Sequence, residues 1–122
     1  MNRTIIGLGA ALAGLAVALG AFGAHGLKEH FAEGGEAWWQ TGGQYMMFHA
    51  LGVILVGLFG RKASPAWLFM AGMVFFSGSL FVMALTGMRW LGAITPIGGV
   101  CFMVGWGIFA WSALREPTRV ED

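Results

Sequence analysis

Seven of the polar side chains that lie within or at the end of otherwise apolar stretches of this sequence are candidates for a functional site. They are the residues that could bind a ligand or carry out a reaction, namely His25, Gln44, Tyr45, His49, Ser77, Ser79 and Thr95. Tyr45 and His49 are four residues apart, so on a helix they share one face. Hydroxyl, amide and imidazole groups in apolar surroundings either hydrogen-bond to one another or recognise a ligand. The candidate ligands are a lipid, a quinone-like molecule or haem.

A metal site and a nucleophilic active site would each need a residue type that the apolar stretches do not supply in the right place. His25 and His49 offer two metal ligands, but zinc takes three or four, usually with thiolate or carboxylate help. The single cysteine, Cys101, lies near the middle of a different apolar stretch and away from His25. A Ser77 or Ser79 nucleophile with His49 as base would want an orienting carboxylate, and no apolar stretch contains one. We therefore expect no enzymatic activity, no metal site and no resident cofactor.

The charged residues divide the chain into four long apolar stretches. Only 11% of the 122 residues are charged, whereas about a quarter are charged in a typical soluble domain. Uncharged segments cover residues 4–24, 38–60, 63–88 and 90–114. Each reaches the roughly 20 residues that a helix needs to cross hydrocarbon, and the alternation typical of a membrane β-barrel is absent. The sequence therefore predicts a single all-α integral membrane domain, an up-down bundle of four transmembrane helices.

The basic residues predict how this bundle is oriented. With four spans, both termini and the second connection share one side of the membrane, which then holds Arg3, Arg61, Lys62, Arg115 and Arg119. The other side holds only Lys28 and Arg89. Basic residues near span ends resist translocation, so we expect both termini in the cytoplasm of a bacterial cell and the protein in its inner membrane. The net charge of +1 offers no basic surface for nucleic acid.

The first span is rich in small residues. They form two stripes, one with Gly7, Ala11, Gly14 and Ala18 and one with Gly9, Ala13, Ala16 and Gly20. In lipid, small residues spaced four apart let helices approach closely, either within one bundle or between two copies of the chain. A cleavable signal peptide is the alternative for this segment, but its apolar stretch is longer than the usual core of about 7–15 residues. We therefore expect the first helix to stay in the protein.

Two local features are expected to shape the connections. Leu27 and Phe31 are four residues apart, which favours a short helix lying in the membrane interface after the first span. Gly34 and Gly35 would end that helix before the second span begins. A solvated turn held down by Phe31 is the alternative. In the fourth span, Pro96 removes a backbone donor and is expected to kink the helix.

Several segments of the chain resemble a known family of small membrane proteins. They are GAFGAHGLK at the end of the first span, QYMMFHA in the second, FSGSL in the third, and TGMRWLGAITPIGG followed by GW in the fourth. In this order they resemble the family catalogued as domain of unknown function 423, which is also described as transmembrane-protein-256-like. The resemblance implies a four-helix integral membrane protein, and it implies no activity, substrate or catalytic residue.

Two function hypotheses follow from these observations. The first is a non-enzymatic packing or accessory module that associates with itself or with a larger membrane complex. The second is a protein that binds a lipid, quinone-like ligand or haem in a polar pocket in the outer half of the membrane. In both cases we expect a neutral His49 that donates a hydrogen bond within the bundle. Its expected partners are Tyr45 on the same helix and Ser77, Ser79 or Thr95 on other helices.

Overall fold

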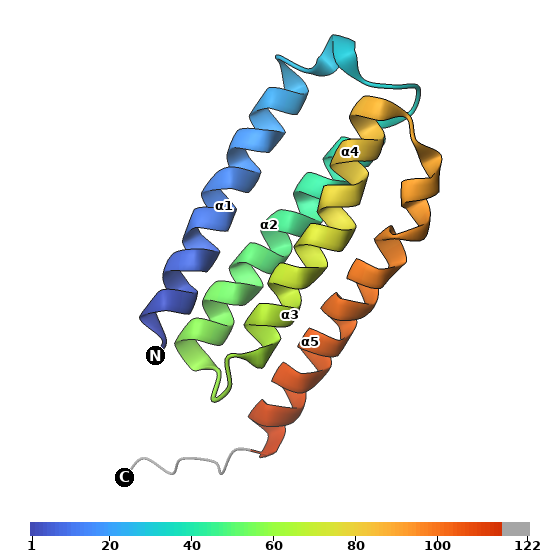
Figure 1. The fold of residues 1–122 in the computed structure, drawn as a ribbon. Helices are drawn as coiled ribbons and strands as arrows, with labels where there is room; N and C mark the ends of the chain where they lie inside the picture. The colour runs from blue at the N-terminus through green and yellow to red at the C-terminus, as the bar shows by residue number, and fades with distance from the viewer. Residues whose placement is uncertain (116–122) are drawn as a thin grey trace.

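The computed structural model describes residues 1–115, and within them every regular element is a helix. Four helical segments are long and apolar enough to cross a membrane, namely Arg3–Ala24, Gly35–Phe59, Ser64–Thr86 and Arg89–Arg115. Successive segments run in opposite directions, as Figure 1 shows. The predicted all-α, up-down architecture of four transmembrane helices is therefore confirmed.

The first two spans are unbroken helices, whereas the third changes its helix type halfway. The first two are α1 (Arg3–Ala24) and α2 (Gly35–Phe59). The third begins as α3 (Ser64–Gly72), continues through the π-helical segment η2 (Met73–Gly78) and ends as α4 (Ser79–Thr86). A π-helical turn inserts residues into the helical repeat and so rotates the side chains that follow it.

The short helix predicted after the first span is present as a single 3-10 turn, η1 (Lys28–His30). Gly34 and Gly35 do not end this helix, so that part of the prediction is wrong. Gly34 has a φ of 79°, in the left-handed region, and is the N-cap residue of α2, which begins at Gly35. The amide of Gly35 donates to the carbonyl of Ala32 at 2.7 Å. Glycine suits position 34 because it adopts positive φ without a steric penalty.

Pro96 begins a helix instead of kinking one. The fourth span opens with a 3-10 turn, η3 (Arg89–Ala93), and continues as α5 (Thr95–Arg115). Pro96 therefore occupies the first turn of α5, where a backbone amide has no partner within the helix and its loss costs little. The predicted kink is wrong, because the change of helix type precedes the proline.

The four spans form an open arrangement in which two helices lie at the edges. Figure 1 shows α1 at one edge and α5 at the other, with α2 and the third span between them. α1 packs mainly against α2, whereas α5 packs against α3 and η2. α2 itself contacts α1, α3, η2 and α4. Both edge helices therefore leave one face free of other parts of the chain.

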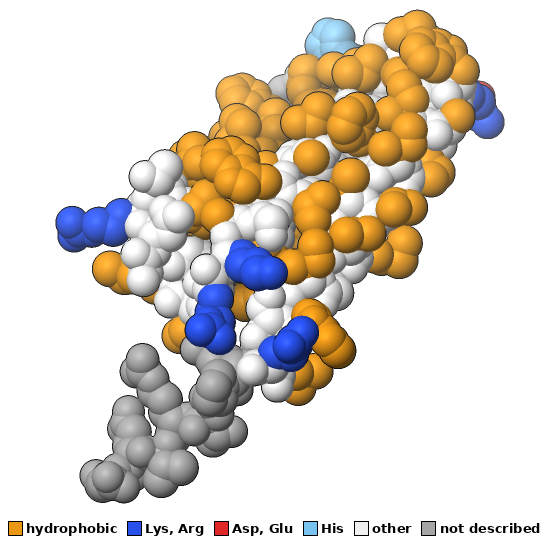
Figure 2. Space-filling view, turned by 60° about the horizontal axis from the view of Figure 1, so that its bottom comes forward, with side chains coloured by type: hydrophobic (Ala, Val, Ile, Leu, Met, Phe, Trp, Pro, Cys, Tyr) orange, Lys and Arg blue, Asp and Glu red, His pale blue; other side chains and the backbone are white. Residues whose placement is uncertain are grey.

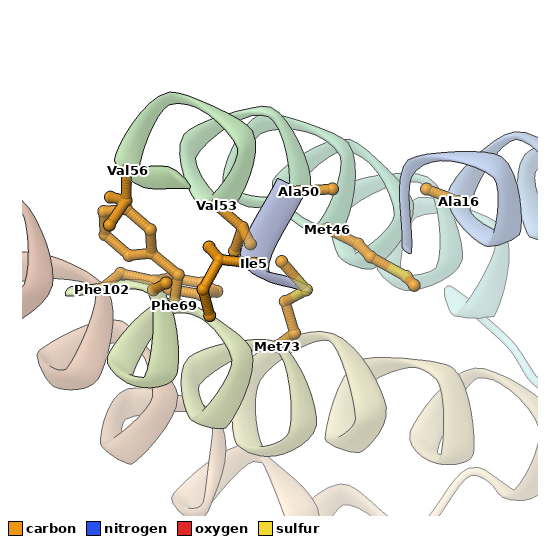
Figure 3. Packing of buried hydrophobic residues seen from close by; sticks show 10 residues of the cluster. Ile5, Ala16, Met46, Ala50, Val53, Val56, Phe69, Met73 and Phe102 are labelled. Atoms are coloured by element: carbon orange, nitrogen blue, oxygen red, sulfur yellow. The ribbon is translucent and has the colours of Figure 1, made fainter. Parts of the chain in front are cut away.

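The buried core lies around the middle two spans, nearer the end that carries the N-terminus. Figure 3 shows its apolar side chains meeting from four helices. Ile5 comes from α1, Val53 from α2, Phe69 from α3 and Phe102 from α5, and each is 5% exposed or less. These side chains pack against one another, and nearby glycines let the helix backbones approach closely.

The closest backbone approach joins the third and fourth spans. A Cβ atom on Gly98 would lie 2.7 Å from the carbonyl oxygen of Gly72 and would also overlap the backbone amide of Phe76. A Cβ atom on Gly72 would overlap the ring of Phe102. Only glycine fits at either position, so this crossing sets how near α5 can come to η2.

The two small-residue stripes of α1 have different roles. Of the second stripe, Gly9 and Ala16 are buried, Ala13 is half-buried and Gly20 is exposed, and a Cβ atom on Gly9 would lie 2.9 Å from the carbonyl oxygen of Ala50 in α2. The other stripe points away from α2 and is exposed along its length, namely Gly7, Ala11, Gly14 and Ala18. One stripe therefore packs partly within the bundle, and the other is open to the surroundings.

We predict that replacing Gly98 with alanine destabilises the protein by about 1–3 kcal/mol, because the new methyl group has to displace backbone atoms. The matched control is Gly107→Ala on the same helix, where nothing lies within 4 Å of the added Cβ. Alanine also favours helix over glycine, so the control is expected to be neutral or stabilising. Unfolding in detergent followed by circular dichroism measures both. Equal stability of the two variants would contradict the close crossing.

Candidate functional site

His49 lies in the buried centre of the bundle, and both of its ring nitrogens are hydrogen-bonded. The side chain is 5% exposed. The indole Nε1–H of Trp106 donates to Nε2 of His49 at 3.0 Å, and Nδ1 lies 2.8 Å from the carbonyl oxygen of Tyr45. An indole can only donate, so Nε2 accepts and the proton is on Nδ1, which donates to Tyr45. The hydrogen bonds therefore define one neutral tautomer.

Aromatic rings enclose this histidine on the remaining sides. Its ring stacks on Phe102 with 3.6 Å between ring centroids and 12° between planes. Phe69 meets it edge-on at 5.3 Å. Glycines on neighbouring helices make room for these rings, because a Cβ atom on Gly105 would lie 2.7 Å from Phe69 and one on Gly52 would lie 3.2 Å from Trp106. The site is packed on all sides and leaves no lone pair of His49 free.

The cross-helix partner of His49 is not the one that the sequence predicted. The hydroxyls of Ser77, Ser79 and Thr95 bond elsewhere, and Trp106 takes the position expected for them. The predicted partner on the same helix, Tyr45, bonds to His49 through its backbone carbonyl and not through its phenol hydroxyl. One signal pointed to Trp106: it is the only tryptophan in the chain that lies well inside a span, and a buried indole N–H usually needs an acceptor.

The serines and the threonine join helices to one another. Ser77 donates to the carbonyl oxygen of Gly42 at 2.7 Å and so links η2 to α2. Ser79 and Thr95 share a hydrogen bond of 2.6 Å between α4 and the start of α5. Ser79 also donates to the carbonyl of Phe76 in the π-helical segment, at 2.9 Å. Within residues 1–115, no buried side-chain nitrogen or oxygen lacks a hydrogen-bond partner.

Of the remaining predicted site residues, His25 and Gln44 lie apart from this buried set, whereas the ring of Tyr45 lies 6.2 Å from the ring of His49. His25 is exposed at the C-terminal end of α1. Its helix meets α2 where Gly23 contacts Trp39, and His49 lies ten residues further along α2, or about 15 Å. The two histidines therefore do not converge on one haem or metal. Gln44 and Tyr45 are also exposed, and Gln44 borders a pocket between α1 and α2.

The described residues define the class of protein to which the chain belongs. Four helices of membrane-spanning length surround polar groups that are paired with one another. Within residues 1–115, no group of three or more His, Cys, Asp or Glu side chains could hold a metal ion. The fold and the site are those of a small polytopic α-helical membrane protein with a hydrogen-bonded polar core.

Comparison with known proteins identifies the family. A family model described as protein of unknown function (DUF423) matches residues 19–99, and the chain belongs to this family. It is 44% identical to a UPF0382 membrane protein of Staphylococcus epidermidis over 93% of this chain and 97% of that protein. It is also 44% identical to the UPF0382 membrane protein YwdK of Bacillus subtilis, over 93% of this chain and 98% of that one. No solved structure is significantly similar to the chain.

We predict that His49 and Trp106 are energetically coupled. His49→Leu and Trp106→Phe should each destabilise the protein by about 1–3 kcal/mol, because each leaves a buried polar atom without its partner. The double variant should cost less than the two single changes together, with a coupling of roughly 0.6–1.7 kcal/mol. Unfolding in detergent measures all three variants.

Trp111→Phe is the control for this cycle, because Trp111 is 62% exposed near the end of the same helix. Its loss should change stability by less than about 0.5 kcal/mol and should be additive with His49→Leu. Strict additivity of His49→Leu and Trp106→Phe would show that the two side chains do not interact.

Proposed function

We propose that this protein is a non-enzymatic packing module of the bacterial inner membrane that associates with a second copy of itself through the outward face of α1. The observation that carries the proposal is the exposed stripe made by Gly7, Ala11, Gly14 and Ala18. Nothing lies within 4 Å of a Cβ atom built on Gly7 or Gly14. In lipid, such a stripe of small residues lets a second helix approach closely enough for dispersion contacts.

The position of α1 in the fold supports this proposal. α1 packs mainly against α2, and its stripe lies on the side away from α2, where Ala11 also borders a groove toward the third span. On one flank a groove of about 510 Å³ separates α1 from the third span, with Leu12, Met73 and Phe81 among its lining residues. An edge helix held along one face has the other face available for a partner.

The satisfied polar core supports a non-enzymatic role. General base and nucleophilic catalysis require a group that can accept a proton from, or attack, a bound substrate. The two ring nitrogens of His49 and the hydroxyls of Ser77 and Ser79 are instead engaged in hydrogen bonds that join the helices. These residues contribute to a rigid bundle, which suits a module that presents surfaces to a partner.

The distribution of basic residues supports an orientation with both termini in the cytoplasm. Figure 2 shows lysine and arginine side chains gathered at the end of the molecule that carries the chain termini. The exposed basic residues at that end are Arg3, Arg61, Lys62 and Arg115. Arg119 also entered the prediction and lies outside the described residues. An excess of positive charge favours the cytoplasmic side.

We predict that cysteines on the outward stripe cross-link between copies. In a Cys101→Ala background, Ala11→Cys and Ala18→Cys should each form a disulfide-linked dimer when membranes are treated with copper phenanthroline, because a parallel pair of α1 helices brings like residues together. The yield is read by non-reducing electrophoresis. The control is Met103→Cys, which is 68% exposed on α5 and should stay monomeric. The proposal fails if the α5 cysteine cross-links as well as the two α1 cysteines.

We predict that the two ends of the bundle differ in their access to the cell exterior. In the same cysteine-free background, Glu33→Cys should react with a membrane-impermeant maleimide in intact cells whose outer barrier, where present, is made permeable. Ser64→Cys, at the start of α3, should react only after the cells are broken. Both residues are exposed, so burial does not limit either reaction. The reverse pattern of labelling would overturn the cytoplasmic placement of the termini.

A further inference from the structure

The seam between α1 and α2 opens into a pocket at the end of the bundle opposite the termini. The pocket has a volume of about 280 Å³, and Gly20, Glu36, Gln40, Gly43 and Gln44 are among its lining residues. Small residues of α1 form one wall, and polar residues of α2 form the other. A Cβ atom added to Gly20 or Gly43 would meet nothing within 4 Å, so the hollow exists because these two residues lack side chains.

The polar wall of the pocket runs from the membrane surface into the hydrocarbon. Glu36, Gln40 and Gln44 follow one another at four-residue intervals on one face of α2, and all three are exposed. Gln44 lies nine residues beyond the start of α2, or about 13 Å along a helix that is a few ångströms longer than the hydrocarbon is thick. None of the side-chain hydrogen bonds within residues 1–115 involves Gln40 or Gln44.

An amide without a partner at that depth is costly, because no water is present to replace the missing hydrogen bonds. The rest of the bundle pairs its buried polar groups. Gln40 and Gln44 are exposed and not paired within the chain, so their amides are available to a ligand that brings hydrogen-bond acceptors or donors to the edge of the hydrocarbon. The ester groups of a phospholipid lie at the boundary between its headgroup and the hydrocarbon, which this row of residues crosses.

The mouth of the pocket carries charges of both signs. A second hollow, of about 590 Å³, adjoins the first and shares Phe31, Glu36 and Gln40 with it. Lys28 also lines this outer hollow, and both Lys28 and Glu36 are exposed. A cation and an anion at one mouth match a headgroup that itself has both charges. An anionic headgroup would meet the carboxylate of Glu36 unfavourably.

We propose that this pocket binds a zwitterionic phospholipid with a primary ammonium headgroup. The ammonium group donates hydrogen bonds to Glu36, and the phosphate pairs with Lys28. The amide groups of Gln40 and Gln44 donate to the ester carbonyls, and one acyl chain lies in the space beside Gly20 and Gly43. A choline headgroup has the same charges but no N–H donors, so it makes a weaker contact with Glu36. This site is distinct from the outward stripe of α1.

The test measures lipid binding to the purified full-length chain by native mass spectrometry. The probes are palmitoyl-oleoyl phosphatidylethanolamine, phosphatidylcholine and phosphatidylglycerol, each titrated separately. Phosphatidylethanolamine should bind at least about fivefold more tightly than either of the others, the size expected for charge-assisted hydrogen bonds at a partly hydrated site. Glu36→Gln should remove that preference, whereas Glu33→Gln, an exposed neighbour outside the pocket, should keep it.

A second pair of variants tests where the lipid sits. Gly43→Leu should fill the pocket and abolish the preference, whereas Gly107→Leu on α5 should leave it unchanged; nothing lies within 4 Å of an added Cβ at either position. Thermal melts establish that both variants fold. Equal binding of the three lipids by the parent, or an unchanged preference in Gly43→Leu, would overturn the proposal. Loss of a dimer in Gly43→Leu without loss of lipid would assign the pocket to a second copy of the chain. Cross-linking at Ala11 and Ala18 reports separately on the α1 interface.

Discussion

In hydrocarbon the hydrophobic effect does not drive apolar helices together, so this bundle depends on close packing between helix backbones. Glycine provides that contact at each main helix pair. Gly9 meets α2 at the carbonyl of Ala50, and Gly72 and Gly98 bring η2 and α5 together. Where these glycines stand determines which helices touch. The rest of the structure, including the aromatic packing around His49, depends on these short distances.

The same solvent determines how polar groups behave inside the bundle. With no water at hand, a buried donor or acceptor has to find its partner within the protein. His49 and Trp106 satisfy one another across α2 and α5, and Ser79 with Thr95 does so between α4 and α5. These pairs orient helices that have few other directional contacts. Groups that look catalytic by type are therefore engaged in hydrogen bonds between helices.

The faces of α1 that do not contact α2 are available to other molecules. α1 is held on one side only, and it leaves a small-residue stripe, an apolar groove and a polar pocket around its remaining faces. The stripe suits a second helix, and the pocket suits a lipid with a polar headgroup. Both proposals place the function of this protein in what it associates with in the membrane. The bacterial relatives are named only as membrane proteins.

The amino-acid sequence alone was enough to predict the class of the protein, because length and charge distribution report directly on the solvent. Four uncharged segments of sufficient length predicted four spans, and the structure has helices at those places. It was also enough to select His49 as a buried polar residue with a partner on its own helix. The number of spans and the polar position of His49 depend only on composition and on neighbours along the chain, and both can be read from a single sequence.

Only the tertiary structure decided which residues from different helices meet. Ser77, Ser79 and Thr95 were equal candidates for His49, but in the structure Ser77 donates to Gly42, Ser79 bonds with Thr95, and Trp106 of α5 donates to His49. The start of α5 at Thr95, with Pro96 in its first turn, likewise follows the 3-10 turn before it. Helix rotation and separation are set by packing across the bundle. The spacing of residues within one helix carries no information about them.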